Sequence, residues 1–204
     1  MKKYKQSETD KLAKILKNDG IISVPTDTVY GICARINSIQ AYNKLKSIKN
    51  RPSNKSFPVM CADEKQIKSI AIVNETVEKL IHAFMPGPIT LVLNKKSEAF
   101  SYINNRGINA TSEMAVRMAP TKVLEDLIYK VESPIFMTSA NQSGQSTCKN
   151  LDEIEKTFPT LDGIMEGNVS FGNASTIIDC TSETIKIQRT GPISIEQILK
   201  VLEN

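Results

Sequence analysis

Residues 21–31 read IISVPTDTVYG, and this stretch sets the beginning of the fold. The mostly apolar run from Ile21 to Val24 predicts a buried strand. Pro25 ends this strand because its nitrogen carries no hydrogen to donate to a sheet. The residues up to Gly31 then form a polar turn between two apolar stretches. The Thr28 side chain in this turn can face a ligand or satisfy backbone groups, and the residues alone leave both possibilities open.

The apolar spacing around this stretch predicts alternating helices and strands. Ser7 is expected to cap the first helix, with Asp10 completing a capping-box pattern. Helices are expected over residues 7–17, 38–48, 74–84, 121–129, 151–158 and 194–202. Strands are expected over residues 21–24, 57–61, 89–93, 115–118, 134–137, 176–178 and 185–188. No repeat or change of composition divides the chain, so we expect one domain over residues 1–204, with helices packed on a single sheet.

The composition is that of an ordinary globular protein, since 40% of the 204 residues are hydrophobic and 24% are charged. The four cysteines are widely spaced and contain no CxxC pair, so neither a zinc site nor a disulfide framework is predicted. No apolar run is long enough to cross a bilayer, and we expect a cytoplasmic protein without membrane contact. The net charge of +4 favours anionic ligands but does not predict a dedicated nucleic-acid binder.

Several common catalytic sites are excluded by the residues that are missing. His82 is the only histidine, and it falls inside an expected helix, where we expect it to be a surface or a satisfied core residue. A Ser/His/Asp triad and a multi-histidine metal site are therefore not predicted, and we assign no metal ligand. The sequence also lacks the GxxxxGK[ST] and GxGxxG phosphate-binding patterns. A bound nucleotide would have to be held in another way.

A basic segment after the second expected helix is the first candidate for phosphate binding. Residues 48–55 read IKNRPSNK. Lys49, Arg51 and Lys55 can converge on a polyphosphate, where arginine supplies a planar fork and lysine a compact charge. The alternative is a solvated basic loop, which is the commoner situation for a lysine-rich segment taken alone.

A second candidate follows the expected strand 134–137, where residues 138–144 read TSANQSG. Hydroxyl and amide groups at a strand end can fix a phosphate, a ribose or a carboxylate, or they can form an ordinary turn. Arg117 lies in an apolar strand, where a buried arginine needs an anionic partner. Arg189 ends another strand beside Gly191 and can reach a phosphate or point to water. Neither arginine identifies a reaction.

Taken together and in order, these segments resemble the threonylcarbamoyl-AMP synthase family, the YrdC-like proteins in their single-domain form. The matching segments are ISVPTDTVYG at 22–31, KNRP at 49–52 with Lys55, PGPIT at 86–90, VR at 116–117, TSAN at 138–141, STIID at 175–179 and RTG at 189–191. The KxR and SxN pairs are weak patterns singly, but their order together with PTDTVYG is specific. The resemblance covers residues 21–193. It implies an α/β fold with a twisted open mixed sheet, flanking helices (YrdC/RibB-like) and a concave basic face.

The resemblance implies a nucleotidyltransferase that uses ATP as a substrate. The amine of L-threonine would take up bicarbonate or CO2, and the resulting carbamate oxygen would attack the α-phosphorus of ATP and expel pyrophosphate. Such chemistry needs positioning and charge neutralisation more than a strong acid or base. Mg2+ is expected on the phosphates, held mainly by the nucleotide and water. The product would serve the threonylcarbamoyladenosine modification of tRNA, with downstream tRNA threonylcarbamoyl transferase proteins as partners and a weak contact with tRNA.

The resemblance also implies a role for individual residues. Those implied at the ATP phosphates are Lys49, Arg51, Lys55 and Arg189. Those that would orient the nucleotide and the reactive carbamate are Ser139 and Asn141, which with Lys49 and Arg51 form the catalytic set. Those implied at the threonine end are Thr28, Arg117, Thr138 and Ser175, where Arg117 can pair with the amino-acid carboxylate.

The sequence departs from the family pattern in two ways. Many relatives carry a histidine a few residues after the equivalent of Lys55, whereas this chain has Met60 in that region, so any role of that histidine is missing or replaced. The sequence also ends at Asn204, without the additional C-terminal domain of longer relatives. We therefore expect whatever covers the site in those relatives to be absent here or supplied by a partner.

Two other functions fit parts of the sequence. A non-catalytic RNA-binding or ribosome-maturation factor could use the same basic face, but aromatic residues make up only 5% of the chain and no basic-aromatic interleaving occurs. A carbamoyl-adenylating module related to hydrogenase maturation proteins is the third possibility, although such modules normally belong to much longer chains. Pyrophosphate release that depends on threonine would distinguish the synthase from the non-catalytic RNA-binding factor.

Overall fold

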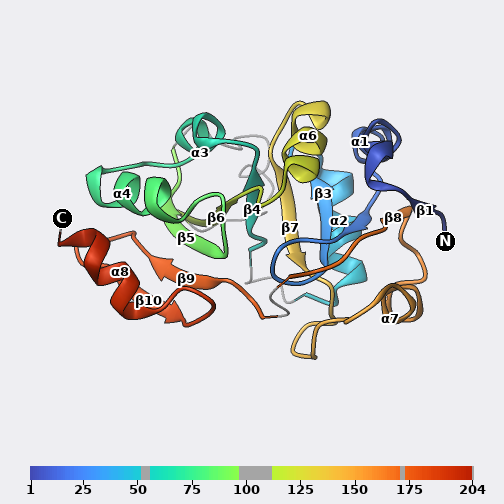
Figure 1. Cartoon of the computed structure of the whole chain (residues 1–204). Helices are drawn as coiled ribbons and strands as arrows, with labels where there is room; N and C mark the ends of the chain where they lie inside the picture. The colour runs from blue at the N-terminus through green and yellow to red at the C-terminus, as the bar shows by residue number, and fades with distance from the viewer. Residues whose placement is uncertain (52–55, 97–111, 171–172, 204) are drawn as a thin grey trace.

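The computed structural model describes residues 1–51, 56–96, 112–170 and 173–203. Its strands are β1 Lys3–Tyr4, β2 Ile22–Val24, β3 Gly31–Arg35, β4 Val59–Cys61, β5 Ile89–Asn94, β6 Glu113–Met118, β7 Ile135–Ser139, β8 Gly163–Met165, β9 Thr176–Asp179 and β10 Lys186–Arg189. In these residues they form a single ten-stranded sheet in the order β1-β8-β2-β3-β7-β4-β6-β5-β9-β10 (Figure 1). It contains both parallel and antiparallel pairs, so the predicted open mixed sheet with flanking helices is confirmed.

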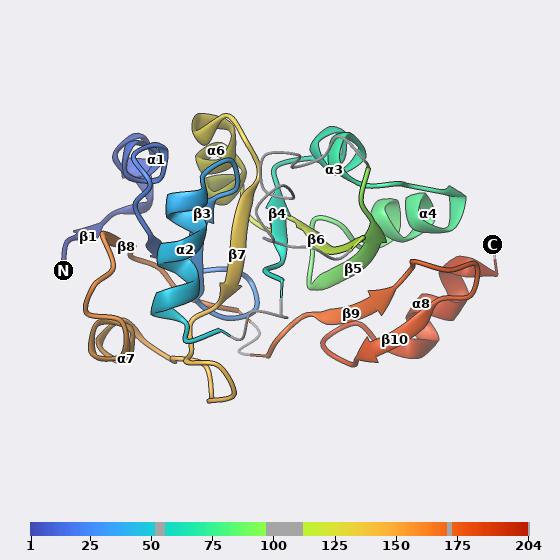
Figure 2. The same ribbon diagram turned by 180° about the vertical axis from the view of Figure 1, so that it is seen from behind.

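The helices lie on both faces of this sheet (Figures 1 and 2). They are the short 3-10 helix η1 Gln6–Glu8 and the α-helices α1 Thr9–Lys17, α2 Ile39–Ile48, α3 Glu64–Ile70, α4 Glu75–Phe84, α6 Lys122–Val131, α7 Leu151–Thr157 and α8 Ile195–Leu202. Helices α1 and α6 pack against each other, and α4 packs against α8 at the end of the molecule that carries the C-terminus. Within the described residues, none of these helices is both long and apolar enough to span a membrane.

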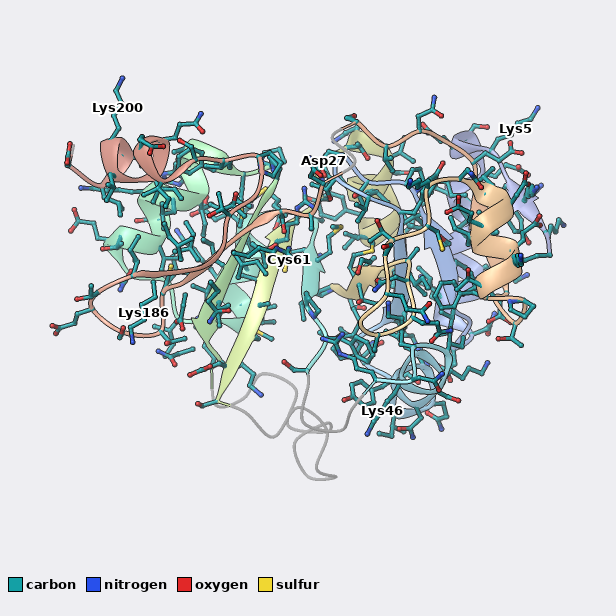
Figure 3. The ribbon with its side chains drawn as sticks, turned by 90° about the horizontal axis from the view of Figure 1, so that it is seen from below. Lys5, Asp27, Lys46, Cys61, Lys186 and Lys200 are labelled. Carbon is teal, nitrogen blue, oxygen red and sulfur yellow. The ribbon has the colours of Figure 1, made fainter. Side chains whose placement is uncertain are left out.

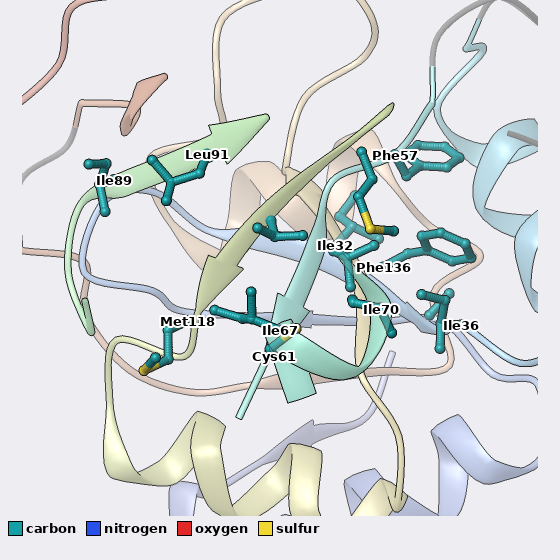
Figure 4. Close-up of a cluster of buried hydrophobic side chains, with 14 of the residues drawn as sticks. Ile32, Ile36, Phe57, Cys61, Ile67, Ile70, Ile89, Leu91, Met118 and Phe136 are labelled. Carbon is teal, nitrogen blue, oxygen red and sulfur yellow. The ribbon is translucent and has the colours of Figure 1, made fainter. Parts of the chain in front are cut away.

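The sheet separates two hydrophobic cores because successive side chains along a strand point to opposite faces. Along β3, Ile32 and Ala34 belong to the larger core, whereas Cys33 belongs to the smaller core under α1 and α6. The larger core contains the aromatic cluster of Tyr42, Phe57 and Phe136, whose ring centroids lie 5.5 to 6.1 Å apart. Figure 4 shows Phe57 and Phe136 together beside Ile32 and Ile36.

Local capping explains why most helices begin where the sequence predicts. The side chains of Ser38, Asn74 and Ser194 each accept a hydrogen bond from a backbone N–H in the first turn of α2, α4 and α8. The prediction for Ser7 is wrong, since this residue lies inside η1 and α1 begins at Thr9 without a side-chain cap. Asp10 instead pairs with Lys130 at 2.9 Å.

In the described part of the chain, four elements were not predicted, namely β1, β3, α3 and β8. Strand β3 matters most because it pairs with β2 and β7 in the middle of one half of the sheet. Its register sets Gly31 opposite Ser139, and the Ala140 N–H donates to the Tyr30 carbonyl at 2.7 Å. A Cβ on Gly31 would lie 2.3 Å from the Met137 sulfur, so a larger residue here would require the Met137 side chain to move.

We expect Phe136→Ala to lower the free energy of unfolding by about 3–5 kcal/mol, because it removes a buried ring of the aromatic cluster and leaves a cavity. Urea unfolding followed by circular dichroism measures this change. Leu199→Ala is the control, since Leu199 is 49% exposed and its truncation should change stability by no more than about 0.5 kcal/mol. A change as small for Phe136→Ala would contradict a core role for this ring.

Candidate active site

A cavity of about 440 Å³ opens where the ends of several strands meet. Its walls come from the turn after β2, from β4 and β6, from the residues that follow β7, and from β9 and the end of β10. Figure 3 places Asp27, next to this cavity, between the two halves of the molecule. The polar lining residues include Thr26, Thr28, Arg51, Thr90, Arg117, Thr138, Ser139, Asn141, Gln145, Thr147, Ser175 and Arg189.

The turn after β2 is held together by the Thr26 hydroxyl. This oxygen accepts hydrogen bonds from the backbone N–H groups of Thr28 and Val29 at 3.2 Å, and it donates to the Val29 carbonyl at 2.6 Å. Its distance to the Thr28 hydroxyl is 3.0 Å. These bonds constrain the turn, which brings Thr28 and Asp27 into contact with Arg117 of β6.

Arg117 on β6 is buried and forms an ion pair with Asp27, with the two side chains 9% and 13% exposed. The same guanidinium donates to the Thr28 hydroxyl at 2.9 Å and to the Gly87 carbonyl at 3.0 Å. Burial lowers the pKa of Arg117, and the nearby Asp27 carboxylate works against this shift. An arginine stays protonated in proteins, so Arg117 remains a cation in the wall of the cavity.

Arg51 follows α2 and reaches the cavity from the side of the aromatic cluster. Its guanidinium carbon lies 4.7 Å from the centroid of the Phe57 ring, and its Nη2 donates to the Ser56 carbonyl at 2.6 Å. Burial lowers the pKa of this arginine too, while the Tyr42 hydroxyl opposes the shift. The Phe57 ring supports the cation without neutralising its charge.

Arg189 enters from the opposite side, at the end of β10. Its Nε donates to the Ser175 carbonyl at 2.9 Å, and its Nη2 lies 3.3 Å from the Ser175 hydroxyl. That hydroxyl is also 2.8 Å from the Thr90 hydroxyl. Gly191 allows this chain segment to approach β9, since a Cβ there would lie 2.5 to 2.7 Å from the backbone of residues 174–176.

The residues after β7 form a tight polar turn at the cavity wall. The Ser139 hydroxyl donates to Asn141 Oδ1 at 2.6 Å, and Asn141 Nδ2 donates to the carbonyls of Gln142 and Gln145 at 2.8 Å. Behind this turn, the ammonium of Lys49 donates to the Ser139 carbonyl at 2.6 Å and also to the Asn141 carbonyl. Lys49 is only 2% exposed and does not line the cavity.

Most of the residues implied by the family resemblance therefore meet at one cavity. Its wall contains Arg51, Arg189, Ser139, Asn141, Thr28, Arg117, Thr138 and Ser175. Lys49 supports the wall from behind, and Lys55 lies outside the described residues. Met60, which stands near the expected family histidine, is a buried apolar residue of the wall.

No sequence motif predicted a role for Asp27, Thr90, Gln145 or Thr147. The role of Asp27 could have been predicted from the sequence. A buried Arg117 requires an anionic partner, and Asp27 lies in the PTDTVYG segment. The partners of Thr90 depend on the pairing of β5 with β9, which no local pattern reveals.

His82 lies on the surface, away from this cavity, and its Nε2 is 3.1 Å from Glu64 Oε2. Together with Glu78 these residues place possible metal-ligand atoms within 4.8 Å of one another. The Lys68 ammonium already pairs with both carboxylates, so this cluster contains its own cation. The cavity is the better candidate for chemistry because its three arginines and its hydroxyl groups can hold an anionic ligand.

Comparison with known proteins places this chain in a family. The Sua5_yciO_yrdC family model, described as "Telomere recombination", matches residues 14–191. The chain is 30% identical over 191 residues to the "Putative threonylcarbamoyl-AMP synthase" of Methanocaldococcus jannaschii, covering 93% of this chain and 88% of that protein. It is 32% identical over 179 residues to the threonylcarbamoyl-AMP synthase of Serratia proteamaculans, covering 84% and 91%.

Solved structures agree with these sequence matches. The structure of Pyrococcus abyssi Sua5 complexed with L-threonine has a TM-score of 0.89 and 27% identity, and it covers 98% of this chain. This chain spans 60% of that longer protein. Escherichia coli YciO shares the fold, with a TM-score of 0.84 at 20% identity, and the two chains cover 97% and 98% of each other. The family model spans most of the sequence and the fold agrees with it, so the chain belongs to the Sua5/YciO/YrdC family.

Proposed function

We propose that this protein is a threonylcarbamoyl-AMP synthase, which makes threonylcarbamoyl-AMP and pyrophosphate from L-threonine, bicarbonate or CO2, and ATP. The observation that carries the proposal is the convergence of Arg51, Arg117 and Arg189 on one cavity lined with hydroxyl groups. These arginines come from three distant parts of the chain. Arg117 is held by Asp27, and all three guanidinium groups lie in a cavity wall where an anionic ligand can reach them.

The phosphates of ATP fit the part of the cavity between Arg51 and Arg189. A guanidinium can bind a phosphate through two parallel hydrogen bonds, which fixes its orientation as well as its charge. Ser139 and Asn141 lie in the same wall and would orient the nucleotide and the carbamate. Lys49 would act through the turn that carries these two residues, because its ammonium donates to their carbonyls.

The threonine end would lie near Arg117, with Thr28, Thr138 and Ser175 around it. Three of the five N–H groups of the Arg117 guanidinium are engaged by Asp27, Thr28 and Gly87. The remaining N–H groups can bind the carboxylate of the amino acid. Asp27 would keep the guanidinium in place for this contact, and so it would act as a positioning residue.

The reaction requires little proton transfer from the protein. The amine of threonine combines with bicarbonate to give a carbamate and water, and a carbamate oxygen then attacks the α-phosphorus. A new phosphorus–oxygen bond forms there while the bond to the β-phosphate breaks, and pyrophosphate leaves. The described residues that line the cavity include no histidine, aspartate or glutamate, which suits catalysis by positioning and charge neutralisation.

Mg2+ would enter with ATP as part of the substrate complex. The same absence of carboxylates from the described cavity wall supports a metal held by phosphate oxygens and water. The product would pass to tRNA threonylcarbamoyl transferase proteins in the cytoplasm, for the threonylcarbamoyladenosine modification of tRNA. A weak direct contact with tRNA is compatible with the net charge of +4. Nothing in the cavity favours the alternative of a non-catalytic RNA-binding factor.

Pyrophosphate release tests the proposed function directly. We expect the purified protein to release pyrophosphate from ATP only when both L-threonine and bicarbonate are present, because the attacking oxygen belongs to their carbamate. A coupled phosphate assay with each component left out in turn measures this requirement. Release that is indifferent to threonine would reject the proposed substrate.

Replacing Arg51 tests the phosphate end of the cavity. We expect Arg51→Ala to reduce kcat/KM by roughly a hundredfold or more, because it removes a cation from the developing charge on the phosphates. The matched control is Arg35→Ala, since Arg35 pairs with Asp19 at 2.6 Å outside the cavity and its loss should leave activity unchanged. Circular dichroism and melting temperature check that both variants fold. Full activity of the Arg51 variant would remove this residue from the site.

Replacing Arg117 tests the threonine end. We expect Arg117→Lys to raise the KM for threonine by about tenfold or more and to change the KM for ATP less, because lysine keeps the charge but loses the planar fork. Arg35→Lys makes the same substitution in an arginine–aspartate pair outside the cavity and should change neither value. Equal increases in both KM values would argue against a specific contact with threonine.

A further inference from the structure

The side chains next to Arg117 on the sheet differ from one side of it to the other. On one side, β4 pairs with β6 and sets Met60 opposite Arg117. On the other side, β5 pairs Leu91 with Val116, so the next residues, Thr90 and Arg117, are neighbours on one face. Met60, Thr90 and Arg117 all line the cavity. Arg117 therefore stands between an apolar side chain and a hydroxyl group.

The apolar side continues onto β7 with a second methionine. Met60 lies opposite Ile135 of β7, and Met137, two residues further along this strand, points to the same face. Met137 lines the cavity and is 8% exposed, whereas Met60 is 1% exposed. The Met137 sulfur occupies the space where a side chain on Gly31 would lie. We call Met60 and Met137 the methionine floor, which offers no hydrogen-bond donor and only weakly accepting sulfur atoms.

The opposite side of Arg117 contains groups that can hold a polar substituent. The Thr90 hydroxyl lies 2.8 Å from the Ser175 hydroxyl, and the Thr28 hydroxyl accepts a hydrogen bond from Arg117 at 2.9 Å. A hydroxyl has one donor and two acceptor sites, so these contacts leave capacity for a ligand. A small ligand whose carboxylate binds Arg117 thus meets an apolar surface in one direction and hydroxyl groups in the other.

We propose that the methionine floor selects threonine by receiving its methyl group, so that Met60 and Met137 are specificity-determining residues. This inference rests on the proposed function, because it concerns the amino acid that the synthase activates. Threonine carries a methyl and a hydroxyl on the same carbon, which matches the two sides of Arg117. With the carboxylate on Arg117, the methyl contacts the floor and the hydroxyl bonds to the opposite side.

Two related amino acids lack this match. L-serine has no methyl group, so the floor loses its contact, and one such group in an apolar pocket changes kcat/KM by about 10-fold to 200-fold. L-allo-threonine has the methyl and the hydroxyl exchanged. Its hydroxyl would face the methionines, which cannot satisfy it, and an unsatisfied polar group is costly. Threonine is therefore expected to be the better substrate by at least about tenfold in both comparisons.

Pyrophosphate release with different amino acids tests this subsite in the full-length protein. We expect the kcat/KM for L-threonine to exceed that for L-serine and for L-allo-threonine as stated above. Met137→Ala removes the more exposed part of the floor, so the threonine-to-serine ratio should fall by about fivefold or more. The same variant should gain activity, relative to threonine, on L-threo-3-hydroxynorvaline, because the truncation leaves room for its ethyl group.

Met118→Ala is the matched control. Met118 is 9% exposed and follows Arg117 on β6, but it belongs to the larger core and does not line the cavity. Its truncation removes the same atoms and should leave both substrate ratios unchanged. Circular dichroism and melting temperature check that the variants fold. If Met137→Ala does not fold, Met137→Gln keeps the length of the side chain, places an amide against the methyl and should also lower the threonine-to-serine ratio.

The outcomes separate this inference from the proposed function. An unchanged threonine-to-serine ratio in the folded Met137 variant would overturn the role of the floor and leave the synthase activity untouched. Equal changes in Met118→Ala would argue against it as well, because they would reflect a general loosening of the sheet. A wild-type protein that uses serine as well as threonine would contradict it directly. Failure of the wild-type protein to release pyrophosphate with any of these amino acids would instead reject the proposed function.

Discussion

The antiparallel pairing of β3 with β7 is the constraint on which the candidate site depends. It sets Gly31 opposite Ser139, and so it joins the constrained turn before β3 to the polar turn after β7. A shift of one residue would exchange the two faces of the strand and carry these turns apart. Met137 packs closely against Gly31, and the alternation of Ile32, Cys33 and Ala34 between two cores holds the register in place.

Among the described residues that line the cavity beside this junction, three are arginines and none is acidic. Asp27 pairs with Arg117, whereas Lys49 and Arg189 donate hydrogen bonds to carbonyl and hydroxyl oxygens. Such groups stabilise a cation but do not cancel its field, so the cavity attracts anions before any substrate arrives. The arrangement lowers the stability of the empty protein in favour of binding, a common compromise at functional sites.

Structural features set by residues close in the sequence could be predicted. Features set by pairing between strands that are far apart in the sequence could not. Ser38, Asn74 and Ser194 mark helix starts because a cap acts within one turn. Strand β3 was missed because GICAR contains a glycine and a charged residue, and its identity comes from β2 and β7. The sequence likewise could not predict that Lys49 lies behind the cavity wall. A basic sequence shows that charge is present, but only the fold shows which charges are buried.

Ser175 has a further consequence, because its hydroxyl lies between Arg189 on one side and Thr90 on the other. Under the proposed assignment, this single oxygen belongs to the neighbourhood of both substrates. A ligand that reorients Arg189 would also change which hydrogen bonds the Ser175 hydroxyl can form. This change would alter the affinity of the adjacent subsite for its own substrate. The two substrates would then bind with mutual dependence, and synergy between them would arise from one shared hydroxyl without any movement of whole domains.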